Sequence, residues 1–167
     1  MRLVRPFVLP AVMLVGAIVL QTTLFGRFRL WGVSPDLVML VVILSALRLS
    51  DESVLVLGFA GGLAVDALST GALGLRALSY TVVAYVAVRT RERADLGPLT
   101  VALWAGLLTL LGVILLVVLG NLSGQILLVG GEALRRIIFV PVLNFGLALV
   151  VAPVTSRLLG SDPLRRR

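Results

Sequence analysis

Uncharged apolar runs long enough to cross a bilayer recur along the whole chain. The first extends from Pro6 to Gly26 without a charged residue, and a spanning helix needs about 20 predominantly apolar residues. Hydrophobic residues make up 59% of the 167 residues, and the mean hydropathy is +1.12. Soluble domains contain only about 45–50% apolar residues. The sequence therefore predicts an all-α integral membrane protein.

The polar breaks between these runs predict six transmembrane helices in a single transmembrane domain, residues 1–167. Residues 53–88 need two of them, because one helix of that length would be about 54 Å long in a hydrocarbon core of about 30 Å. Residues 120–136 fit neither a spanning helix nor a soluble loop, so a re-entrant or interfacial segment is expected there. The expected helices are about 7–25, 34–49, 53–68, 75–88, 99–119 and 137–158, with a basic cytoplasmic tail at 159–167.

The 15 basic residues, all arginine, give the chain a net charge of +7. They lie between and beside the apolar runs, which is typical of topology signals and headgroup contacts. We therefore expect these arginines to contact the bilayer and not nucleic acid. With six helices and a cytoplasmic N-terminus, most arginines fall on the cytoplasmic side. The distribution predicts a multi-pass protein with both termini in the cytoplasm.

The residue types that carry most enzyme chemistry are missing. The chain has no His and no Cys, which removes most nucleophile–base pairs and most transition-metal sites. It also has no Lys for a phosphate-binding P-loop. We expect no catalytic residue, no metal site and no cofactor, and hence no enzymatic activity.

One segment places polar residues inside an apolar run. Gly58, Gly62 and Asp66 are spaced four apart, so they share one face of the expected third helix. The glycines suit close helix packing, either within the protein or against a partner's transmembrane helix. A charged Asp66 in the membrane needs a partner, and Arg76 beyond the turn is the expected one; solvation at a shallow interface is the alternative. Gln21 and Asn144 are expected to join helices.

The order of these motifs resembles the rod-shape-determining protein MreD family over roughly residues 15–90. The resemblance rests on "LQTTLFGRFRLWGVSPDLVMLVV", on the "LRLSD" break, and on "GFAGGLAVDALSTGALGLRALSYTVVAY". The break after the second helix is usually Gly-rich in the family, whereas this chain has "RLSDES". The positions that match the family pattern are Gln21, Pro35, Asp36, Gly58, Phe59, Gly62, Leu63, Asp66, Gly74, Ala77, Leu78, Ser79 and Tyr80.

The resemblance implies a non-enzymatic subunit of the bacterial cell-elongation complex in the cytoplasmic membrane. Such a subunit would bind MreC, a bitopic protein with an extracytoplasmic coiled coil. Through it, the subunit would be linked to the MreB filament and to RodA with its transpeptidase, supporting peptidoglycan synthesis and cell shape. The resemblance also implies a fold similar to the substrate-binding subunits of energy-coupling-factor transporters.

That likeness leaves a second function open, a small-solute (vitamin-type) binding subunit of a transporter. A binding subunit needs convergent polar and aromatic groups around a pocket. The chain offers two Trp, two Tyr and no His, which favours the adaptor over the solute-binding subunit.

Overall fold

A computed structural model describes residues 5–23, 32–69, 71–94, 97–124 and 131–158. The described residues form six α-helices and a 3₁₀ turn, with no β-strand, which confirms the all-α prediction. The tail expected at 159–167 lies outside them. The elements are α1 (Arg5–Thr23), α2 (Leu37–Ser45), α3 (Asp51–Ala67), α4 (Leu75–Thr90), η1 (Arg91–Ala94), α5 (Pro98–Leu122) and α6 (Gly131–Leu158).

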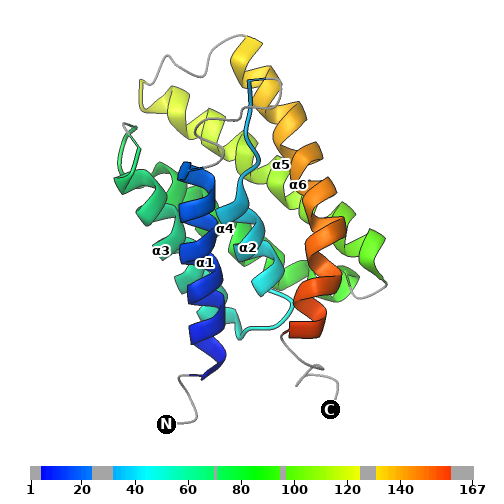
Figure 1. Cartoon of the computed structure of the whole chain (residues 1–167). Coiled ribbons are helices and arrows are strands. Elements are labelled where there is room, and N and C mark those ends of the chain that lie inside the picture. Colours follow the sequence, from blue (N-terminus) through cyan, green and yellow to red (C-terminus); the bar gives the residue numbers. More distant parts are fainter. Residues whose placement is uncertain (1–4, 24–31, 70, 95–96, 125–130, 159–167) are drawn as a thin grey trace.

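Helix α2 lies in the middle of the bundle (Figure 1). It contacts each of the other five α-helices, and every residue in it except Val41 is buried. Helices α3 and α4 form one antiparallel hairpin and α5 and α6 another. The first turn of α1 and the last turn of α6 lie at the same end of the bundle (Figure 1).

The boundaries of α2 differ from those expected. The helix was expected to start near residue 34, but Asp36 is its N-cap, because the Asp36 Oδ1 accepts a hydrogen bond of 3.1 Å from the Met39 amide. Pro35 precedes the helix. The helix ends at Ser45, not near Leu49, and the chain continues in turns.

Arg91 holds these turns at the end of α2. Its Nη1 donates to the carbonyl oxygens of Ala46 and Leu49, at 3.4 and 3.2 Å. Its Nη2 lies 3.0 Å from Oδ1 of Asp51 in the first turn of α3. Carbonyl groups at a helix end have no partner within the helix. The donors of Arg91 can satisfy them, which allows α2 to end earlier than expected.

The segment between the last two helices is more helical than expected. α5 continues to Leu122, and α6 begins at Gly131 instead of near 137. Ala133 is buried, whereas Glu132 and Arg135 are exposed, so one face of this first turn packs and the other carries charge. The acidic Glu132 also suits the positive end of the helix dipole. The remaining residues, 125–130, lie outside the described residues.

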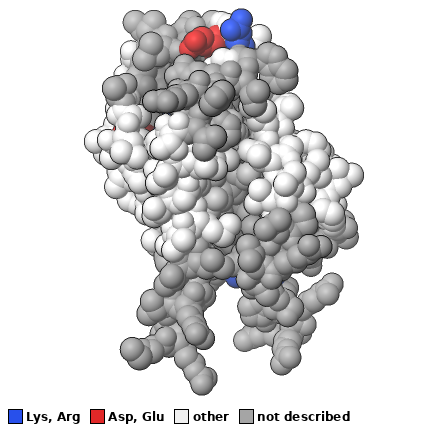
Figure 2. Space-filling model, viewed as in Figure 1, with Lys and Arg blue, Asp and Glu red and all other residues white. Residues whose placement is uncertain are grey.

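The outer surface of the helices is apolar. Val15 on α1, Phe59 on α3, Leu107 on α5 and Val142 on α6 are each more than half exposed, and Figure 2 shows a broad uncharged area below charged side chains at its upper edge. By length and composition, Pro98–Leu122 and residues 131–151 can cross a membrane among the described residues. A surface of this kind is suited to contact with hydrocarbon.

The two glycines expected to permit close packing face α4. A Cβ atom on Gly62 would lie 2.5 Å from the Cα of Ala77, and one on Gly58 would lie 2.9 Å from the Tyr80 carbonyl oxygen. Both glycines are buried. In the structure both glycines therefore pack against α4.

Candidate functional site

One cluster of polar side chains connects all six α-helices inside the apolar bundle. We call it the polar cluster. Asp36, Asp66, Thr109 and Asn144 are buried in it, and Tyr80 is fully buried. Its members are Gln21 of α1, Asp36 at the N-cap of α2, Asp66 of α3, Arg76 and Tyr80 of α4, Thr109 of α5 and Asn144 of α6.

Asp36 joins α2 to α4. Its Oδ2 accepts a hydrogen bond of 2.6 Å from the Tyr80 hydroxyl, while its Oδ1 caps α2 through the Met39 amide. Gln21 of α1 contributes to the same helix start, because its Oε1 accepts from the Val38 amide at 3.3 Å. Side chains from two other helices therefore surround the N-terminus of α2.

Asn144 joins α5 and α6 to the segment that enters α2. Its Oδ1 accepts from the Asp36 amide at 3.1 Å, and its Nδ2 donates to the Asp36 carbonyl oxygen at 3.0 Å. The same Nδ2 lies 3.2 Å from Oγ1 of Thr109, to which it donates. Thr109 Oγ1 in turn donates to the Ala105 carbonyl oxygen at 2.8 Å. A single amide side chain thus uses both its ends to connect three parts of the bundle.

Asp66 caps α4 from the neighbouring helix. Its Oδ2 accepts hydrogen bonds from the backbone amides of Gly74, Arg76 and Ala77, at 2.9, 3.0 and 3.3 Å. The N-cap of α4 is Gly74, with a φ of 99° and no side chain of its own to accept them. The carboxylate of Asp66 therefore supplies what a Ser or Asp N-cap would normally provide.

Arg76 is less tightly bound to Asp66 than the sequence suggests. Its Nε lies 3.9 Å from Oδ1 of Asp66, and its Nη1 lies 3.8 Å from Oδ2 of Asp36. Its hydrogen bond to the Tyr80 hydroxyl is 3.5 Å long, and its side chain is 27% exposed. The negative charges of Asp36 and Asp66 are offset by the Arg76 guanidinium. The N-termini of α2 and α4, which carry partial positive charge, offset them further.

The remaining motif residues are scattered over the fold. Phe59 is exposed on α3, Pro35 is buried beside Asp36, and Gly74 forms the turn into α4. Ser79 is fully buried, and its Oγ has no hydrogen-bond partner among the described residues. Thr109 was not singled out from the sequence, because a lone Thr in an apolar helix gives no signal.

The two carboxylates of the polar cluster accept hydrogen bonds from donors of the protein itself. Both accept them from backbone amides, and Asp36 accepts another from the Tyr80 hydroxyl. Within the described residues, no group of three or more His, Cys, Asp or Glu could hold a metal ion. What the arrangement does is hold helices together.

The sequence model of the family described as rod shape-determining protein MreD matches residues 1–159. The chain belongs to this family. The match confirms the family predicted from the motifs and identifies a rod-shape-determining membrane protein. Neither the comparison with curated proteins nor that with solved structures gave a match. The expected likeness of this MreD-family protein to transporter subunits therefore stays a prediction.

Proposed function

We propose that this MreD-family protein is a non-enzymatic subunit of the cell-elongation complex in the bacterial cytoplasmic membrane. In this proposal it binds an MreC-like bitopic protein and, through it, supports peptidoglycan synthesis. Its links to the MreB filament and to RodA with its transpeptidase are indirect. The family match is the basis of the proposal.

One structural observation supports an adaptor, namely that the buried polar groups of the polar cluster bind one another. Asn144 contacts Asp36 and Thr109, Tyr80 contacts Asp36, and Asp66 contacts the start of α4. A solute-binding subunit instead directs such groups into a pocket. Groups that hold a fold together leave the outer surfaces of the helices for partners and lipid.

The proposed topology is multi-pass with both termini in the cytoplasm. The first turn of α1 and the last turn of α6 lie at one end of the bundle (Figure 1), which an even number of membrane crossings requires. Arg48 follows α2, Arg89 stands in the last turn of α4, and Arg91 follows α4, where the chain would return to the cytoplasm. Arginine on that side agrees with the positive-inside rule.

Affinity purification from native membranes in mild detergent tests the proposal. We expect a bitopic protein with a soluble coiled coil to co-purify with the tagged chain, and depletion of the chain to make rod-shaped cells round. A tagged six-helix membrane protein of unrelated function serves as the control for non-specific capture. Recovery of a transporter's energising subunits in place of cell-wall proteins would show that the chain is a solute-binding subunit.

A further inference from the structure

The longest of the described helices carries a proline in its interior. α6 has 28 residues, and Pro141 stands between helical residues on both sides. Because proline has no amide hydrogen, the carbonyl oxygen of Ile137 loses its hydrogen bond within the helix, and the proline ring crowds that oxygen. Proline is one of the few causes of sharp helix kinks, and α6 changes direction near its middle in Figure 1. We call residues 131–140, which precede the proline, the α6 arm.

The part of α6 that follows the proline is fixed to the bundle. Asn144 exchanges hydrogen bonds of 3.1 and 3.0 Å with the backbone of Asp36 and donates to Thr109 at 3.2 Å. Ala148, one turn further along, is fully buried in the main apolar core. This part of α6 is therefore held both by the segment that enters α2 and by α5.

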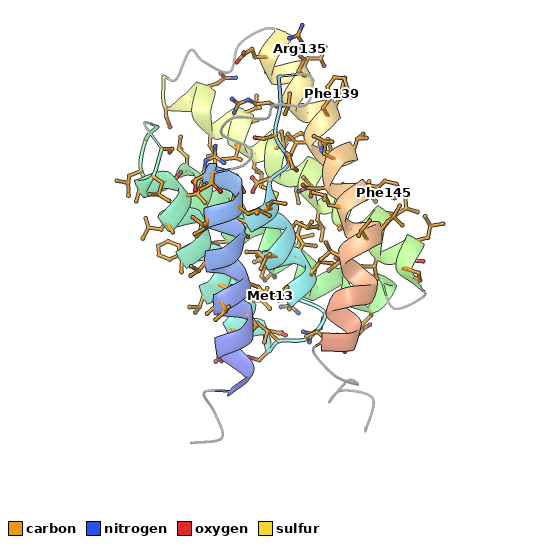
Figure 3. The ribbon with its side chains drawn as sticks, in the orientation of Figure 1. Met13, Arg135, Phe139 and Phe145 are labelled. Carbon is orange, nitrogen blue, oxygen red and sulfur yellow. The ribbon has the colours of Figure 1, made fainter. Side chains whose placement is uncertain are left out.

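The α6 arm has few buried residues. Within it only Ala133 and Val140 are buried. Figure 3 shows Arg135 and Phe139 on the arm, above Phe145 on the fixed part of the helix. Segments with few buried apolar contacts open at a low free-energy cost. The large apolar side chains that the arm exposes are Leu134, at 59%, and Ile138, at 50%.

The arm packs in a small apolar cluster that is separate from the main core. Val140 is buried there together with Val33 and with Val113 of α5, and Ile137 and Phe139 are half-buried against them. Three buried valines hold the arm, whereas the main core gathers residues from all six α-helices. The two parts of α6 therefore differ in how firmly they are bound.

The segment that leads into α2 contacts α6 on both sides of the proline. Val33 lies in the small cluster with Val140, before the proline. Asp36 is bound through its backbone to Asn144, after the proline. The residues between Val33 and Asp36 are not helical. We call residues 33–36 the brace, because they connect the arm to the fixed part of the same helix.

The brace ends at the start of the central helix. Asp36 caps α2 through the Met39 amide and accepts a hydrogen bond from Tyr80 of α4. A displacement of the brace therefore displaces the N-terminus of α2, which contacts each of the other five α-helices.

We infer that α6 is hinged at Pro141 and that the brace holds the hinge closed. The structure shows the closed state, with Val33 in the small cluster. When Val33 leaves the cluster, the α6 arm moves away from α5 while the rest of α6 stays bound through Asn144. Because the brace continues into α2, a protein that binds the exposed side of the arm also acts on the central helix. The inference concerns this chain alone and does not depend on which partner the protein binds.

Distances between spin labels in purified protein in lipid nanodiscs test the inference. The chain has no cysteine, so two introduced cysteines give one labelled pair. Val56→Cys on α3 with Leu134→Cys reports the position of the arm. Val56→Cys with Val150→Cys reports the fixed part of α6 and is the control. All three side chains are more than half exposed, and double electron–electron resonance gives the distribution of each distance.

We expect the distribution for the arm pair to be broader than that for the control pair. Pro141→Ala restores the helix hydrogen bond and should narrow the arm distribution to the width of the control. Val33→Ala weakens the small cluster and should broaden the arm distribution further. Val118→Ala, at an exposed valine of α5, should leave it unchanged. An unchanged control pair shows that each variant is folded.

Three results would overturn the inference. Equal widths for the two pairs in the wild-type protein would show that the arm is as rigid as the rest of α6. A Pro141→Ala protein whose arm distribution is as broad as that of the wild type would place the movement elsewhere. A Val33→Ala distribution equal to that of the wild type would show that the brace does not hold the arm.

Discussion

The hydroxyl of Tyr80 on α4 donates a hydrogen bond of 2.6 Å to Oδ2 of Asp36, the residue that caps α2. Asp36 also exchanges two backbone hydrogen bonds with the Asn144 side chain of α6. The start of a short central helix is thus tied to helices on two sides of it. The polar cluster is built around this one residue.

Replacing Tyr80 with Phe should destabilise the protein without changing its shape. The substitution removes the hydrogen bond to a buried carboxylate oxygen, and hydrogen bonds to charged groups contribute about 1.5–3 kcal/mol. The free energy of unfolding in mixed detergent is the measurement. Tyr85→Phe is the matched control, because Tyr85 is 51% exposed on the same helix. Equal stability of the two variants would contradict the role given to Tyr80.

Replacing Asp66 with Leu should lower the stability of the α3–α4 hairpin, because three amides at the start of α4 lose their acceptor. Asp51→Leu is the comparison, since Asp51 is an exposed carboxylate in the first turn of the same helix. Its ion pair with Arg91 should contribute at most about 1 kcal/mol. Thermal unfolding of the purified variants in detergent measures both effects.

Exchange of the two charges, Asp66→Arg with Arg76→Asp, distinguishes capping from simple ion pairing. A pair held by charge alone would recover part of the lost stability when both signs are reversed. An arginine cannot accept hydrogen bonds from amides, so we expect no recovery. Recovery to near the wild-type melting temperature would show that the ion pair, and not the cap, is the main contribution of Asp66.

Replacing Gly62 with Ala should lower the stability of the protein far more than replacing Gly146 with Ala. The added Cβ at Gly62 would meet the backbone of Ala77 at 2.5 Å, whereas at Gly146 it would meet nothing within 4 Å. Overpacking of this kind costs about 1–3 kcal/mol. Denaturation of the Gly62→Ala and Gly146→Ala proteins measures the difference in stability. If the Gly62→Ala protein were as stable as the wild type, α3 and α4 could move apart without loss of stability.

Single cysteines in two exposed acidic positions test the topology. An impermeant thiol reagent added to intact spheroplasts should label Glu132→Cys and leave Glu92→Cys unlabelled until the membrane is permeabilised. Both residues are exposed, so a difference in labelling reports the side of the membrane. Labelling of Glu92→Cys from outside would contradict the six-crossing topology with cytoplasmic termini.

The sequence predicted the number of helices and the need for a partner at Asp66, but not the identity of that partner. The apolar runs and the polar breaks between them predict the number of helices. The free-energy cost of a charge in the membrane predicts that Asp66 needs a partner. The partners of Asp66 are backbone amides whose positions depend on the shape of the turn at Gly74, with its positive φ. A single sequence does not encode that shape in any readable pattern.

The same limit applies to Asp36. The expected helix at 34–49 placed Asp36 near a helix start, yet its hydrogen bonds reach residues 44 and 108 positions away in the sequence. Gln21 and Asn144 were recognised as polar residues that join helices, because an amide in an apolar helix has few other uses. That Asn144 would meet Asp36, and not another helix, follows only from the packing of all six helices.

The central claim is that the polar cluster holds the scaffold and does not itself bind the partner, and one measurement tests it most directly. Asn144→Leu removes the hydrogen bonds to Asp36 and Thr109 from inside the bundle. Co-purified MreC-like protein is quantified per molecule of folded protein, with folding read from monodisperse elution in detergent. The account predicts less folded protein but wild-type partner recovery per folded molecule. Wild-type folding with partner recovery at background level would contradict it, because the cluster would then be part of the binding site.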